Sequence, residues 1–234
     1  MEQNSINILC TRPLNELLIR EAAEEGILIE ELPFIQTEPI QSIEVQQEIE
    51  QAFQQNVTVV FTSMNAVEAV AYYQEEGAPD WDIYCMGTTT RKLVAQHFGE
   101  ERIVGTADDA ASLAELIVEE DVTAEVIFFC GDQRRDELPD ILRGHDVDVN
   151  EVTVYQTIAL THKIEKTYHG ILFFSPSAVE SFFKFNVLPA ETILFAIGNT
   201  TANTIRKFTK NKVLISDAPG KDNLVKKMIE YFAG

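Results

Sequence analysis

The chain has 234 residues, of which 45% are hydrophobic and 24% charged, a composition typical of a globular protein and not of a disordered one. Its 38 acidic residues outnumber 18 basic ones and give a formal net charge of −20, so its surface repels a phosphate backbone and disfavours nucleic acid binding. No apolar run approaches the roughly 20 residues of a membrane-spanning helix, and residues 1–4 lack the basic start of a secretory signal, so we expect a cytoplasmic protein without a membrane segment.

Short apolar runs alternate with amphipathic stretches along the chain. Residues 57–61 are rich in β-branched side chains and predict a buried strand, after which Ser63 caps a helix that Gly77 closes. The same cycle recurs at residues 83–86 with 89–98, and at residues 171–174 with a helix opened by Ser175 and Pro176. Strands that alternate with helices of about ten residues imply parallel sheets covered by helices on both faces.

Four segments recur in the same order in the two halves of the chain. Residues 8–10 match 128–130, residues 29–37 match 149–157, residues 61–68 match 174–180, and residues 86–90 match 197–201. Ordered matches of this kind indicate an internal duplication, so we expect two copies of one α/β unit. Two similar lobes usually meet at a cleft, and such sheets bind ligands beyond the carboxyl ends of their strands.

The cysteines and histidines do not form a recognisable metal or disulfide motif. Cys10, Cys85 and Cys130 are far apart and lie in apolar, strand-like runs, so we expect buried thiols in a reducing compartment. The four histidines show no HExxH or paired spacing. Neither GxGxxG nor GxxxxGK[ST] occurs. We therefore expect neither a metal nor a nucleotide cofactor.

Hydroxyl-rich loops follow strands in both copies, at the starts of helices. Helix N-termini expose unpaired N–H groups and suit a carboxylate or phosphate, although Ser and Thr also cap helices where no ligand binds. Because the loops are related in pairs by the duplication, we expect them to line a cleft that binds anions. The candidate binding residues are Thr62, Ser63, Gly87, Thr89, Thr90, Ser175, Ser177, Gly198, Thr200 and Thr201.

Arginines also follow two of the strands. Arg12 comes after residues 8–10, and Arg134 and Arg135 come after residues 128–130. A guanidinium at such a place suits bidentate binding of a carboxylate. For Arg134 we favour the alternative, an ion pair with a nearby acidic residue (Asp132, Asp136 or Glu137).

Tyr155 lies in a strand-like segment and, taken alone, is a packing residue. No Ser-His-Asp set and no cysteine with a neighbouring histidine can be assembled. The residues alone thus predict a duplicated, two-lobe protein with a cleft for anions, and they do not predict a reaction.

At these residues the chain resembles the uroporphyrinogen-III synthase family. The resembling segments are residues 11–13, 61–67, Gly87 with its threonines, 131–138, 154–157, 174–179 and 197–201, in the family's order. The resemblance implies two doubly wound, flavodoxin-like α/β lobes. Residues 1–35 with 158–234 would form one lobe and 38–155 the other, joined by connecting strands at 35–40 and 155–160.

The reaction implied by the resemblance is that of a cyclising lyase in haem biosynthesis. Hydroxymethylbilane, a linear tetrapyrrole polycarboxylate, would lose water and close with inversion of ring D through a spiro-pyrrolenine, without a metal or organic cofactor. Tyr155 matches the tyrosine of the family's Val-Tyr-x-Thr segment, which implies an acid for the leaving hydroxyl, acting directly or through water. The hydroxyl-rich loops, Arg12 and Arg135 match positions that hold substrate carboxylates, with a structural role as the alternative for Arg12. The chain departs from common members at residues 132–134, where glycines are frequent.

Other interpretations remain open from the sequence. A two-lobed module could bind a small polycarboxylate or a tetrapyrrole without chemistry, a flavodoxin-like enzyme could handle phosphates, and a degenerate family member could serve as a partner of another tetrapyrrole enzyme. We expect a flexible monomer, because two strands make a thin hinge. The resemblance also leaves room for a transient contact with the preceding enzyme of the pathway.

Overall fold

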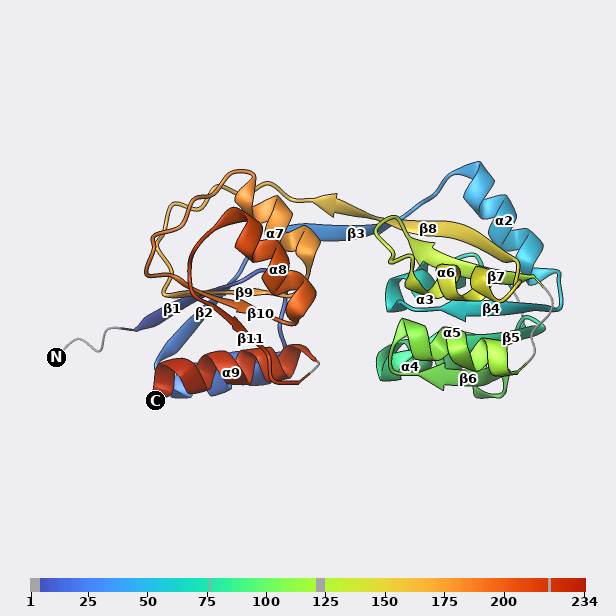
Figure 1. The fold of residues 1–234 in the computed structure, drawn as a ribbon, viewed down its shortest axis with the longest axis horizontal. Coiled ribbons are helices and arrows are strands. Elements are labelled where there is room, and N and C mark those ends of the chain that lie inside the picture. The colour runs from blue at the N-terminus through green and yellow to red at the C-terminus, as the bar shows by residue number, and fades with distance from the viewer. Residues whose placement is uncertain (1–4, 76, 121–124, 219) are drawn as a thin grey trace. The chain divides into compact units, whose positions relative to one another are not determined.

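A computed structural model describes residues 5–75, 77–120, 125–218 and 220–234. Residues 1–4, over which we expected no secretory signal, lie outside this part. The chain divides into two compact units: unit 1 comprises Met1–Gln36 and Ile158–Gly234, and unit 2 comprises Thr37–Thr157. The chain enters unit 2 within strand β3 (Ile35–Pro39) and leaves it within strand β8 (Val149–Ala159), as Figure 1 shows.

Unit 1 is built on a five-stranded sheet of order β11-β10-β9-β1-β2, in which each pair of neighbours is parallel. Its remaining elements are β1 (Ile6–Cys10), α1 (Glu16–Glu24), β2 (Ile27–Glu31), β9 (Gly170–Phe173), α7 (Pro176–Phe183), β10 (Ile193–Ala196), α8 (Asn199–Phe208), β11 (Val213–Ile215) and α9 (Lys221–Ala233). Alternate strand residues pack on opposite faces. Leu9 and Phe173 pack with α7 and α8, and Ile8 and Leu172 pack with α1 and α9.

Unit 2 is built on a six-stranded sheet of order β3-β8-β7-β4-β5-β6. Its remaining elements are α2 (Ile43–Phe53), β4 (Val57–Phe61), α3 (Met64–Ala71), β5 (Trp81–Met86), α4 (Gly87–Phe98), a short 3₁₀ turn (Glu100–Arg102), β6 (Ile103–Ala107), α5 (Ala110–Glu119), β7 (Val126–Gly131) and α6 (Glu137–Gly144). The five strands from β8 to β6 are parallel. Strand β3 joins in the opposite direction, since the Ile40 N–H donates to the Val154 carbonyl and the Leu160 N–H to the Phe34 carbonyl, each at 2.9 Å.

Helices cover both faces of the sheet in unit 2 as well. Phe61 and Phe129 pack on one face with α2, α3 and α4, while Val60 and Phe128 pack on the other with α5 and α6. Strands that are buried on both faces need continuous apolar runs, and residues 57–61 and 126–131 supply them. The prediction of an α/β fold with parallel sheets covered on both faces is confirmed.

One predicted boundary is wrong. Helix α3 ends at Ala71, six residues before Gly77. The N–H groups of Tyr73 and Gln74 bond to the carbonyls of Val70 and Ala71, three residues back, at 3.0 and 3.1 Å. Bonds of this type tighten and end an α-helix, so the helix stops before the glycine is reached.

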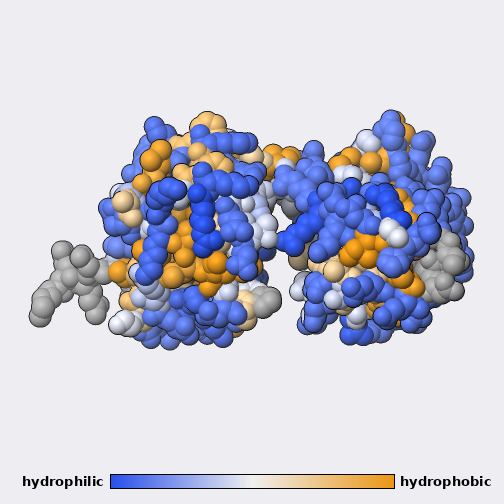
Figure 2. Space-filling view, viewed as in Figure 1, coloured by the Kyte–Doolittle hydropathy of each residue, from blue (hydrophilic) through white to orange (hydrophobic). Residues whose placement is uncertain are grey.

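The surface seen in Figure 2 is mainly hydrophilic in both units, with smaller hydrophobic areas, as the acidic composition suggests. Within the described ranges, helices of the length and apolar character required to span a bilayer do not occur.

Burial determines the reactivity of the three cysteines. Cys10, Cys85 and Cys130 are buried free thiols, and burial raises the pKa of Cys10 to about 12, that of Cys85 to about 11, and that of Cys130 above its usual value. A raised pKa keeps a thiol protonated and unreactive at pH 8.

We predict that at pH 8 fewer than one thiol per chain reacts rapidly with Ellman's reagent in the native protein. Unfolding in guanidinium chloride should release three reactive thiols per chain. Three rapidly reacting thiols before unfolding would contradict this burial.

Candidate functional site

A cavity of about 400 Å³ lies at the carboxyl ends of β4, β5, β6 and β7 in unit 2. Parallel strands bring their carboxyl ends to one edge of a sheet, and α/β proteins bind ligands there. The polar side chains that line this cavity are the hydroxyls of Thr62, Ser63 and Tyr155, the guanidinium groups of Arg134 and Arg135, and the carboxylates of Asp108, Asp109 and Glu137. Three backbone segments that are far apart in sequence thus supply hydroxyl and guanidinium groups to one cavity.

Tyr155 and Ser63 are joined by a hydrogen bond. The Tyr155 hydroxyl donates to Ser63 Oγ at 3.1 Å, and Ser63 Oγ also accepts from the Asn65 N–H at 3.2 Å. Ser63 is therefore the N-cap of α3, as expected from the sequence, and at the same time it fixes the hydroxyl of Tyr155. Both accepting positions of its oxygen are used, and among the described residues its own proton has no acceptor.

The two arginines of the cavity differ in their partners. Arg134 forms ion pairs with Asp136 and Glu151. Burial opposes its charge, but these carboxylates prevail and raise the pKa of Arg134. The expected ion pair with Asp136 is confirmed, whereas the pairing with Glu151 was not predicted. Within the described part of the chain Arg135 makes no ion pair, so its guanidinium is available to a ligand.

None of the three acidic residues of the cavity was predicted from the sequence as part of the site. Asp108 and Asp109 come from the turn between β6 and α5, and Asp109 accepts the Ser112 N–H at 2.8 Å as the N-cap of α5. That backbone hydrogen bond lowers the pKa of Asp109, so the carboxylate stays charged. The sequence does contain a pair of aspartates before an alanine-rich helix. That pattern predicts a helix cap, but it does not predict which residues of other strands lie beside the cap.

The turn from β5 to α4 supplies Met86 to the cavity lining, and not the glycine and threonines expected from the sequence. Met86 lines the cavity, and Gly87, with φ +76°, begins the helix in the left-handed region that favours glycine. Thr89 is exposed and Thr90 is buried, and neither they nor Gly87 belong to the cavity lining.

The predicted residues of unit 1 lie at the corresponding edge of their own sheet. Arg12 follows β1 and lies over the ring of Phe174 at 5.6 Å. Ser175, the N-cap of α7, accepts the Ala178 N–H at 3.2 Å, and its hydroxyl lies 3.2 Å from that of Ser177. At the start of α8, Gly198 is the N-cap, Thr200 is exposed and Thr201 is buried. The neighbouring strands β1, β9 and β10 bring these residues to one edge.

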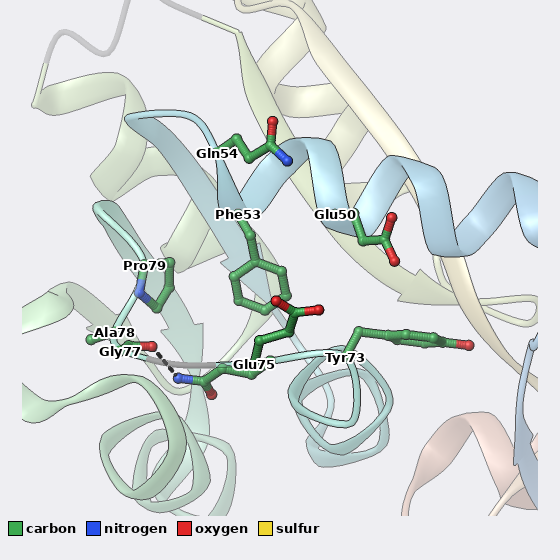
Figure 3. A pocket seen from close by; sticks show the side chains of 9 residues that line it. Glu50, Phe53, Gln54, Tyr73, Glu75, Gly77, Ala78 and Pro79 are labelled. Carbon is green, nitrogen blue, oxygen red and sulfur yellow. Dashed lines mark hydrogen bonds between the residues drawn. The ribbon is translucent and has the colours of Figure 1, made fainter.

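A second cavity of unit 2, of about 340 Å³, lies at the amino ends of β4 and β5 and is drawn in Figure 3. Its lining includes the carboxylates of Glu50 and Glu75 beside the ring of Phe53, and none of the described residues that line it is an arginine or lysine. A cavity of this charge suits a cation and repels a carboxylate. It therefore differs in chemistry from the cavity that contains Tyr155 and Arg135.

No group of three or more His, Cys, Asp or Glu side chains within the described ranges is arranged to hold a metal ion.

Comparisons with known proteins place the chain in a family. The sequence profile of HEM4, described as uroporphyrinogen-III synthase HemD, matches residues 16–226. Comparison with curated proteins gives no significant match.

Solved structures share the fold. Uroporphyrinogen-III synthetase from Helicobacter pylori is 17% identical, with a TM-score of 0.67 over 97% of this chain and 99% of that chain. A mutant uroporphyrinogen III synthase from the extremely thermophilic bacterium Thermus thermophilus is 12% identical, with a TM-score of 0.64 over 97% and 98% of the two chains. The profile covers most of the sequence, and the structural matches extend over the whole fold. The chain belongs to the uroporphyrinogen-III synthase family, the cyclising lyases of haem biosynthesis.

Proposed function

We propose that the cavity of unit 2 binds the reacting end of hydroxymethylbilane and that Tyr155 protonates its leaving hydroxyl, directly or through one water. The observation that supports this most is the Tyr155 hydroxyl, held by Ser63 in the same cavity as Arg135, which makes no ion pair with any residue that the structure describes. A phenol supplies a proton, and a guanidinium fixes a carboxylate of the same substrate.

Tyr155 gives its proton to the hydroxyl oxygen, the carbon–oxygen bond breaks, and water leaves, so that an azafulvenium cation and the Tyr155 phenolate remain. Ring closure through a spiro-pyrrolenine and inversion of ring D then restore the aromatic pyrroles. Because the overall reaction releases only water, the proton lost by Tyr155 returns from the substrate within the cycle. Holding the chain ends in a productive geometry supplies most of the advantage over spontaneous closure, up to roughly 7–11 kcal/mol in favourable cases.

The substrate carboxylates are held by local donors despite the acidic composition. Exposed charges are screened beyond about 8 Å at physiological salt, whereas a hydrogen bond to a charged group contributes roughly 1.5–3 kcal/mol. In this proposal Arg135 and the loop of Thr62 and Ser63 bind substrate carboxylates in unit 2. The binding residues proposed in unit 1 are Arg12, Ser175, Ser177, Gly198, Thr200 and Thr201, and those beside the cavity of unit 2 are Gly87, Thr89 and Thr90.

The two units also support the proposed duplication. The strand order β6-β5-β4-β7-β8 of unit 2 corresponds to β11-β10-β9-β1-β2 of unit 1, and the recurring segments of the sequence lie in or directly after the same pairs of strands. We propose two lobes, residues 1–35 with 158–234 and residues 38–155, that act as one monomer. The buried free thiols support a reducing compartment such as the cytoplasm.

Product analysis tests the function directly. Purified protein is given freshly generated hydroxymethylbilane, and the oxidised products are separated into the type I and type III isomers. We expect predominantly type III. Type I alone, formed at the rate without enzyme by folded protein, would instead support a binding module.

Tyr155→Phe tests the proposed acid. The variant loses one proton donor and one hydrogen bond, so we expect kcat for the type III isomer to fall about a hundredfold and the free energy of unfolding to change by about 1 kcal/mol. Tyr73→Phe, a tyrosine of unit 2 outside this cavity, is the control and should keep wild-type turnover. Wild-type turnover in Tyr155→Phe would remove the assignment.

Arg135→Gln tests carboxylate binding. Loss of one charge-assisted hydrogen bond should raise KM about tenfold or more with little change in kcat. Lys92→Gln makes the same change in net charge at an exposed site on α4 outside the cavity and should leave KM unchanged. Equal increases of KM in both variants would indicate a general effect of charge and not a contact with substrate.

A further inference from the structure

Strands β7 and β8 contain an irregularity at the point where Tyr155 lies. Cys130 pairs with Thr153, but the next residue, Gly131, pairs with Tyr155. Val154 is therefore an extra residue on β8, which defines a β-bulge.

The bulge changes the direction of the Tyr155 side chain. In a regular strand, consecutive side chains point to opposite faces. Val152 and Val154 are buried in the core under α2, α3 and α4, and Tyr155 packs against that same core. The bulge thus turns Tyr155 to the face on which α3 begins with Ser63, the residue that receives its hydrogen bond.

Gly131 provides the space for the ring. A Cβ atom built on Gly131 would lie 2.6 Å from Cε2 and 2.7 Å from the hydroxyl oxygen of Tyr155, far inside the 3.5–4.0 Å of an ordinary contact. The φ of Gly131 is not among the positive ones. Its φ therefore does not require glycine, and the three atoms nearest to the added Cβ all belong to Tyr155.

Asp132 closes the bulge. Its N–H donates to the Tyr155 carbonyl at 3.1 Å, and its Oδ1 accepts the Thr157 N–H at 2.9 Å. Asp132, the residue after Gly131, therefore fixes the backbone from the Tyr155 carbonyl to the Thr157 N–H.

We propose that Gly131 is a positioning residue. Its missing side chain leaves room for the Tyr155 ring, and the bulge that Asp132 closes directs that ring. Together they place the Tyr155 hydroxyl so that it bonds to Ser63 and faces the cavity. This inference rests on the proposed role of Tyr155 for its effect on turnover. The seating of the ring itself can be tested without turnover.

Gly131→Ala is the primary test. The added methyl group should displace the ring and lower kcat between about tenfold and about a hundredfold, with little change in KM. Gly105→Ala is the matched control, because its Cβ would lie 2.6 Å from Cε1 of Tyr84, a clash of the same kind outside the cavity lining. Gly105→Ala should keep wild-type kcat for folded protein. A wild-type kcat in Gly131→Ala, or equal losses in both variants, would overturn the proposal.

A double-mutant cycle shows whether Gly131 acts through Tyr155. In the Tyr155→Phe background, Gly131→Ala should cause no further loss of kcat, since the acid is already absent. Independent, multiplying losses would overturn the proposal. Should Tyr155→Phe alone retain wild-type turnover, the acid assignment fails, and the position of the ring is then decided by spectroscopy.

The spectroscopic readout uses ring-labelled tyrosine and NMR. The signal of Tyr155, one of six tyrosines, is assigned by its loss in Tyr155→Phe. Its chemical shift should change in Gly131→Ala and stay the same in Gly105→Ala. An unchanged chemical shift in Gly131→Ala would contradict the proposed role of Gly131 in positioning the ring.

Asp132 gives a second route if Gly131→Ala does not fold. Asp132→Ala removes the acceptor for the Thr157 N–H without adding bulk, and should shift the Tyr155 signal and lower kcat. Asp132→Asn keeps an acceptor oxygen and should restore both. Wild-type behaviour of Asp132→Ala would overturn the role of the bulge.

Discussion

The central strands of both sheets are largely buried, and this constrains where polar chemistry can occur. Val59, Val60 and Phe61 are fully buried, and every residue of β7 from Val126 to Gly131 is buried. A polar side chain within such a strand would lose its water without gaining a partner. Hydroxyl and charged groups therefore collect where strands end, and parallel pairing brings those ends to one edge.

The distribution of charge makes this edge unusual for a site that binds carboxylates. Residues 37–157 contain 25 acidic and 6 basic residues, a formal charge of −19, so nearly all of the net charge of −20 belongs to unit 2. Asp108 and Asp109 lie in the cavity itself. Because Arg134 is neutralised by Asp136 and Glu151, Arg135 is the guanidinium of this cavity left for a ligand, judged from the ion pairs of the described residues.

Tyr155 depends on features from three parts of unit 2. The bulge directs its side chain, Gly131 leaves room for the ring, and Ser63 accepts its hydroxyl proton in a hydrogen bond. Ser63 has its geometry because it also caps α3. A local helix cap and a long-range hydrogen bond thus share one oxygen atom, which couples the start of a helix to the position of the phenol.

The sequence by itself determined the features that arise from neighbours along the chain. Apolar runs predicted the buried strands, the β-branched residues 57–61 among them, and Ser63 and Ser175 predicted two helix caps, because both signals depend on residues within one or two turns. The ion pair of Arg134 with Asp136 was equally local. Tertiary structure decided the rest. The pairing of Arg134 with Glu151, the entry of Asp108 and Asp109 into the cavity and the bulge beneath Tyr155 all depend on which strands pair and in which register. Register is fixed only when two strands distant in sequence meet, so no local pattern around Tyr155 could show that its ring lies on Gly131.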